Sequence, residues 1–162
     1  MLVVLAVNDQ GRMNTMFFLD KFNSKLQQMR DAGVITADEY NAANLPMWFR
    51  TKDDVMRAFT EPSSPEVARQ LSHLKVLSAD VRVMPCPYYE QFKLGNVSNE
   101  KFARDYVSSC RAWSKPILTI AFKDPRVMDQ AYEFVVEEIL KSTETEFAGD
   151  DYVEAYINIE KM

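Results

Sequence analysis

A continuous aliphatic run near the start of the chain is the feature that most restricts its fold. Residues 2–7 read LVVLAV, without a polar side chain, and are followed by Asn-Asp-Gln-Gly. A run of this kind is typical of an inner strand covered on both faces, as found in parallel sheets. A strand needs neighbours, and this one comes first, so we expect its partners from later in the chain or from another polypeptide.

The composition is that of a soluble globular protein with its own core. The chain has 162 residues, 47% hydrophobic and 27% charged, with a net charge of −5. No basic stripe is present, so nucleic-acid binding is not expected. The aliphatic run is too short for a transmembrane span and lacks the basic flank of a signal peptide, so no membrane association is expected. Cys86 and Cys110, in unrelated segments, favour reduced core thiols and a cytoplasmic location.

The rest of the chain alternates between helical and strand periods. The patterns predict α/β structure in a single partial domain. Its segments are an inner strand at 1–12, a helical cap at 13–73, a strand at 74–87, a cap loop and two long helices at 88–150, and a terminal strand at 151–162. The helices after the first strand are expected to cover a pocket.

Two common kinds of chemical site find little support in the sequence. The four glycines are isolated from one another, so neither a G-x-G-x-x-G loop nor a P-loop can form. His73 is the single histidine, without a second histidine or a paired cysteine, and a metal site is not expected. A Cys–His pair between His73 and Cys86 or Cys110 stays open as a minor alternative.

Four stretches of the chain share their order and character with motifs of one enzyme family. They are MLVVLAVNDQGR (1–12), DAGVITADEYNAANLPMWFRTKDDV (31–55), RAWSKPIL (111–118) and YVEAYINIEKM (152–162). The second is the closest, because it is similar to the family's glycine, short acidic helix, Phe-Asn-Ile-Pro-x-Tyr and Ser-x-Glu-Glu-Val sequence. The chain thereby resembles the C-terminal half of the SABATH family, the salicylate-type, S-adenosylmethionine-dependent carboxyl methyltransferases.

The resemblance implies the C-terminal part of a Rossmann-like methyltransferase sheet with a helical cap, and without the cofactor-binding N-terminal half. In the family, the cofactor loop and the groups that hold the substrate carboxylate all precede the matching segment. S-adenosylmethionine is therefore expected in a full-length family enzyme, and no cofactor is expected to bind this chain alone. The implied partners are a small carboxylic acid and either a separate N-terminal half or a second copy of the chain, as in a homodimer.

The family's acyl-substrate pocket matches six positions of this chain. They are Phe18 and Leu19 in the first helix, Trp48 after the Asn-x-Pro motif, Cys110 and Trp113 before Pro116, and Tyr152 at the start of the last strand. All six are apolar or aromatic, as a pocket for an apolar acid requires, and none is expected to be catalytic. Trp48 replaces a tyrosine, Lys115 a glutamate and Trp113 a small aliphatic residue, so the resemblance implies a smaller or reshaped pocket.

Two functions are therefore considered. The first is the substrate-pocket portion of an S-adenosylmethionine-dependent methyltransferase that acts on the carboxylate of a small acid, inactive as this chain alone. The alternative is a non-catalytic small-molecule binding or interaction protein that retains the cap pocket. Core packing alone would also explain the aromatic positions, and an unrelated α/β domain in which the motif order arises by chance is a third reading.

Overall fold

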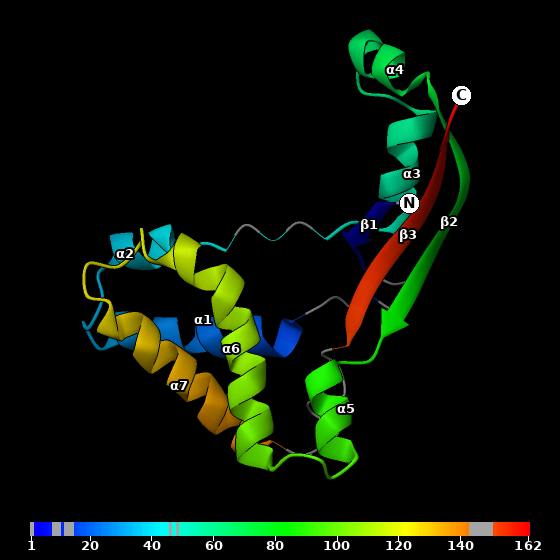
Figure 1. The fold of residues 1–162 in the computed structure, drawn as a ribbon. Helices are drawn as coiled ribbons and strands as arrows, with labels where there is room; N and C mark the ends of the chain where they lie inside the picture. Colours follow the sequence, from blue (N-terminus) through cyan, green and yellow to red (C-terminus); the bar gives the residue numbers. More distant parts are fainter. Residues whose placement is uncertain (1, 8–10, 12–14, 46, 48, 143–150) are drawn as a thin grey trace. The chain divides into compact units, whose positions relative to one another are not determined.

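A computed structural model describes residues 2–7, 11, 15–45, 47, 49–142 and 151–162 (Figure 1). Within these residues the structure is mixed α/β, with seven helices and three strands. The chain divides into two compact units. The sheet unit comprises Met1–Asn14, Trp48–Pro85 and Asp151–Met162, and the helical unit comprises Thr15–Met47 and Cys86–Asp150.

The sheet unit is built on a small antiparallel sheet. Its strands are β1 (Leu2–Leu5), β2 (Leu74–Met84) and β3 (Tyr152–Lys161), in the spatial order β1-β3-β2. Because β3 is antiparallel to both neighbours, β1 and β2 run parallel to each other on either side of it. The predicted alternation of β3 is confirmed, since Val153, Ala155 and Ile157 are all buried on one face.

The first strand has one paired edge and one mostly open edge. Along β3, Ala6 donates its N–H to the Val153 carbonyl at 2.9 Å, which sets the alternation of the antiparallel ladder. The backbone groups of Val3 and Leu5 therefore point to the opposite edge. Among the described residues, that edge meets only Arg50, whose carbonyl accepts the Val7 N–H at 3.0 Å in an isolated parallel bridge.

Two short helices lie in the sheet unit, although the sequence pattern placed them in the cap. They are α3 (Lys52–Thr60), which packs against β2, and α4 (Pro65–Leu71). Both begin where the sequence predicts. Thr51 and Asp54 form a capping box, and Pro65 occupies the first turn of α4.

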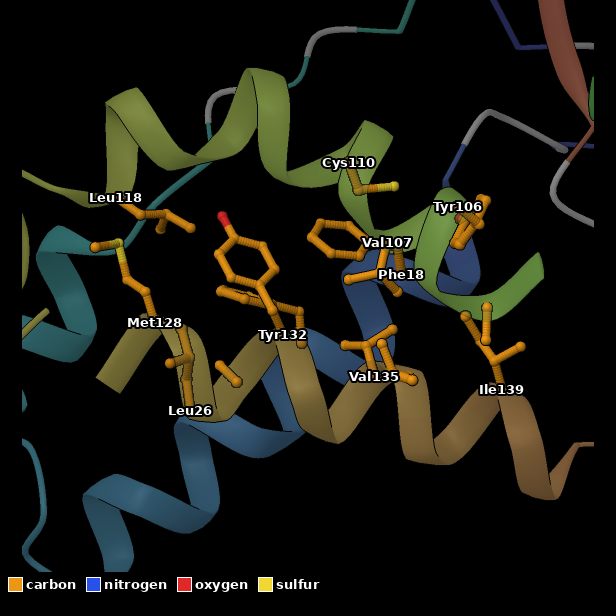
Figure 2. Packing of buried hydrophobic residues seen from close by; sticks show 14 of the residues in the cluster. Phe18, Leu26, Tyr106, Val107, Cys110, Leu118, Met128, Tyr132, Val135 and Ile139 are labelled. Atoms are coloured by element: carbon orange, nitrogen blue, oxygen red, sulfur yellow. The ribbon is translucent and has the colours of Figure 1, made fainter. Parts of the chain in front are cut away.

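The helical unit consists of five helices around one apolar core. They are α1 (Met16–Asp31), α2 (Ala37–Ala42), α5 (Pro87–Lys93), α6 (Asn99–Leu118) and α7 (Arg126–Lys141). The long helix α7 packs against both α1 and α6, and buried side chains of all three interdigitate (Figure 2). Cys86 and Cys110 are both buried here, as expected of core thiols.

Residues 87–93 form the helix α5, whereas the sequence pattern predicts the end of a strand at Pro87 and a loop from residue 88. Pro87 fits the first turn of a helix, and Tyr89 and Phe92, one turn apart, pack on the Phe102 ring of α6 at 5.7 and 5.3 Å between centroids. Gly95 then ends the helix at φ 72°, a left-handed conformation that glycine adopts without a steric penalty. Contacts with the following helix thus stabilise a segment that its own sequence leaves ambiguous.

No helix in the described ranges is both long enough and apolar enough to cross a membrane.

Candidate functional site

Four aromatic rings from three helices meet in the helical unit. Phe18 and Phe22 lie one turn apart on α1, with ring centroids 5.3 Å apart. The Phe18 ring stacks on Tyr132 of α7 at 6.2 Å and meets the edge of Trp113 of α6 at 5.8 Å. Each such pair contributes about 0.5–1.5 kcal/mol beyond the area it buries. We call Phe18, Phe22, Trp113 and Tyr132 the aromatic cluster.

A hydrogen-bonded pair of hydroxyls joins α6 to α7 beside these rings. The Ser114 hydroxyl donates to the Cys110 carbonyl oxygen at 2.7 Å, and its oxygen lies 2.8 Å from the Tyr132 hydroxyl. Ser114 is fully buried and Tyr132 is 3% exposed. A buried polar pair of this kind is stable only when its partners are in place, so it holds the two helices in one register.

Burial dominates the electrostatics of this pair. It raises the pKa of the Tyr132 phenol above its ordinary value, while the Ser114 hydrogen bond and the Arg111 charge act in the opposite direction. The Arg111 guanidinium lies over the Tyr132 ring, 5.1 Å from its centroid, and forms an ion pair with Asp129. The phenol therefore stays protonated at neutral pH and acts as a hydrogen-bond donor.

The structure brings part of the predicted pocket together. Phe18 and Trp113 are in ring contact, and Cys110 lies one turn before Trp113 on α6 in the same apolar core. Phe18 and Cys110 are 0% and 1% exposed, so both lie in the interior of the helical unit. Trp113 and Leu19 are partly buried and keep some accessible surface.

The other two predicted positions belong to the sheet unit. Trp48 falls outside the described residues. Tyr152 begins β3 in the sheet unit, opposite Met84 of β2, and the two-residue period of a strand puts it on the same face as Glu154 and Tyr156.

That face of the sheet carries a polar and aromatic cluster. The Tyr156 phenol donates a hydrogen bond to the Glu154 carboxylate at 2.6 Å, and this bond raises the pKa of Tyr156. The Arg82 guanidinium lies 4.8 Å from the centroid of the Tyr156 ring. These groups are partly or largely exposed, so the contacts orient the side chains and contribute little stability.

Sequence reasoning did not identify Ser114 and Tyr132 as site residues. The available signal was Ser114, a hydroxyl four residues after Cys110 and therefore on the predicted apolar face of α6. A lone hydroxyl in an apolar stripe requires a buried partner.

An open groove runs along α1 on the side formed with the end of α2. Its volume is about 270 Å³, and it is lined by Leu19, Asp20, Phe22, Asn23, Leu26, Ala43, Asn44 and Leu45. Phe22 and Leu26, each 2% exposed, form an apolar floor, and the three polar side chains lie around it. Of the six residues predicted for the pocket, Leu19 lines this groove.

The described residues do not provide a binding loop for S-adenosylmethionine. Gly33 and Gly95, at φ 70° and 72°, follow the C-termini of α1 and α5 and end those helices. Gly11 follows β1 as a single glycine, without the second one that a tight cofactor loop needs. We therefore derive no step of methyl transfer through the cofactor from these residues.

No family model matches the chain, and no curated protein matches it either.

Proposed function

We propose that this chain forms the substrate side of an S-adenosylmethionine-dependent methyltransferase that acts on the carboxylate of a small acid. The observation that carries the proposal is the edge contact between Phe18 and Trp113. The two residues match the family's acyl pocket through separate motifs, and they come from helices that are distant in the sequence. Their contact is what a common pocket wall requires.

The sheet gives independent support. Its strands β1 and β2 are parallel to each other, and the backbone groups of Val3 and Leu5 are directed to an edge that meets no strand among the described residues. An edge of this kind accepts further strands readily. In the proposed enzyme, the cofactor-binding strands of a Rossmann-like sheet continue from this edge, supplied by another segment.

In the proposed enzyme, the cofactor supplies the methyl group and the side chains of this chain bind the acid. When bound, S-adenosylmethionine supplies an electrophilic methyl group, and the transfer needs a carboxylate held in line with it more than it needs acid–base catalysis. The exposed part of Trp113 binds the apolar body of the acid and excludes water. The fully buried Phe18 ring, which contacts Trp113, fixes the position of this wall.

The first experiment is complementation. Isothermal titration of the isolated chain with S-adenosylmethionine is expected to show no binding. Addition of the polypeptide encoded directly ahead of the Met1 codon is expected to restore cofactor binding and methyl transfer to members of a panel containing salicylate, benzoate and phenylacetate. The proposal is wrong if the complemented protein binds the cofactor and methylates no acid in a broad panel.

The second experiment tests the wall itself. In the complemented protein, Trp113→Leu is expected to shift activity towards bulkier acids, because it removes a large ring from the wall. Ile120→Ala is the matched control, since Ile120 is 89% exposed on the same unit and its loss should leave the preference unchanged. If the isolated chain binds an apolar acid and no cofactor-binding segment is encoded upstream, the non-catalytic binding protein becomes the better explanation.

A further inference from the structure

The groove along α1 has a chemistry that the proposed acid pocket does not use. Its floor is apolar, and its polar groups are the Asp20 carboxylate and the side-chain amides of Asn23 and Asn44. Among the residues that the structure describes, no basic side chain lines it. A carboxylic acid would meet only like charge there, so the groove requires a different ligand.

The charge of Asp20 is not neutralised by the cations of its own helix. Lys21 forms an ion pair with Glu138 of α7 at 3.2 Å, and Lys25 lies over the Phe134 ring of α7, 5.1 Å from its centroid. Both lysines are thus engaged with α7, whereas Asp20 lies in the groove wall on the side of α2. The electrostatic preference of the groove is therefore for a cation.

The amides add a directional preference. The Asn23 side-chain oxygen accepts a hydrogen bond from the Tyr40 hydroxyl at 3.0 Å, which fixes the orientation of this amide. Its NH₂ group remains as a donor, and the Asn44 amide offers both a donor and an acceptor. The head group of the ligand must therefore donate a hydrogen bond to the Asp20 carboxylate, and the Asn23 and Asn44 amides line the same groove.

The groove has room for a ligand of one ring. A cavity of about 150 Å³ in an engineered protein core holds a benzene molecule, and this groove has about 270 Å³. We infer that the groove binds a small primary amine carried on a single apolar ring, with the ring over Phe22 and Leu26 and the ammonium group at Asp20. This inference does not depend on the proposed methyl transfer.

The test is a pair of ¹H–¹⁵N and methyl NMR titrations on the full chain. The probes are phenethylamine and phenylacetate, which share a ring and differ in the sign of their charge. Phenethylamine is expected to cause saturable shifts in the Asn23 and Asn44 side-chain amides and in the Leu26 and Leu45 methyl groups. Phenylacetate is expected to bind there several-fold more weakly.

Three variants separate the effect of charge from the effect of shape. Asp20→Asn should weaken phenethylamine binding about two- to fivefold, the effect of one exposed ion pair, and remove the preference for the amine. Glu137→Gln removes an equal charge from the exposed side of α7 and should change neither. Ala43→Phe fills the groove and should abolish saturation while the rest of the spectrum is retained.

Three results would overturn the inference. They are equal binding of the two probes at these residues, phenethylamine binding that is unchanged in Asp20→Asn, and shifts that grow linearly with concentration at every lining residue. None of them bears on the complementation experiment, so the two proposals can fail separately.

Discussion

Replacing Ser114 by alanine and Tyr132 by phenylalanine, singly and together, tests whether their hydrogen bond fixes α6 on α7. Ser114 has one hydroxyl proton, which it donates to the Cys110 carbonyl oxygen at 2.7 Å. The Tyr132 phenol must therefore be the donor in the 2.8 Å contact between the two hydroxyls. Both side chains are buried, so water cannot replace a lost partner without opening the helix pair.

The two single changes are not equivalent. Tyr132→Phe removes the donor and leaves Ser114 bonded to Cys110, so it should cost about 0.5–1.5 kcal/mol of unfolding free energy, the net value of a typical hydrogen bond. Ser114→Ala leaves a buried phenol proton without an acceptor, which should cost about 1–3 kcal/mol. In the double variant no polar group is left unpaired, so its cost should fall short of the sum by about 1 kcal/mol or more.

Urea unfolding followed by tryptophan emission measures this coupling. A Trp48→Phe background leaves Trp113, which touches Phe18, as the only indole, so the signal reports on the helical unit. Ser109→Ala is the control, because Ser109 bonds only to the Tyr106 carbonyl of its own helix, at 2.7 Å, and should combine additively with Tyr132→Phe. Additive costs for Ser114→Ala and Tyr132→Phe would refute the argument that the pair locks the helices.

Three further predictions follow from buried or capping groups. Phe18→Ala should destabilise the helical unit by about 3–5 kcal/mol in the same urea assay, because a fully buried ring leaves a cavity between three helices. Burial raises the pKa of Tyr132 in the folded state. The neutral phenol therefore contributes its full stability below the pKa of an unfolded tyrosine. This contribution is lost as the pH rises through the pKa of Tyr132 in the folded state. Unfolding midpoints measured against alkaline pH should therefore decline less steeply in Tyr132→Phe. Hydrogen bonds from the backbone N–H groups of Thr36 and Lys123 lower the pKa of Glu39. The stability that the Glu39 carboxylate contributes is therefore present above the pKa of an unfolded glutamate. It is lost as the pH falls through the pKa of Glu39 in the folded state. A carbon NMR titration should place the Glu39 midpoint below that of an exposed glutamate in the same chain, and Glu39→Gln should flatten the acid side of the stability curve.

The local elements could be predicted because short-range chemistry determines them. Thr36 and Glu39 form the predicted capping box, with the Glu39 N–H bonded to the Thr36 hydroxyl at 3.1 Å and the Thr36 N–H bonded to the Glu39 carboxylate at 2.9 Å. Ser98 caps α6 as predicted, and β2 spans Leu74–Met84 as its alternating pattern indicates. Each of these signals lies within about four residues of the structure it specifies.

The assembly of these elements could not be read in the same way. Periodicity places Phe22, Trp113 and Tyr132 on the apolar faces of their helices. It does not show which rings meet, because that depends on how the helices pack and in what register. The aliphatic run at residues 2–7 indicated a strand covered on both faces, yet Leu2 and Val3 are 43% and 41% exposed. Apolar character alone does not specify a strand's neighbours, and here the described neighbour is the antiparallel β3.

The burial of Phe18 and Cys110 shows whether they could affect the choice of acid substrate directly or only through Trp113. Phe18 and Cys110 have no accessible surface, so neither can touch a ligand while the helical core is intact. Any influence they have must pass through the position of Trp113, whose ring rests edge-on against Phe18. A change of acid preference in Phe18→Ala would therefore be accompanied by a loss of stability and an altered Trp113 emission. In Trp113→Leu the preference should change with a smaller loss of stability, since this ring is only partly buried. If the two effects cannot be separated in this way, the rings belong to the helical core alone and take no part in binding the acid.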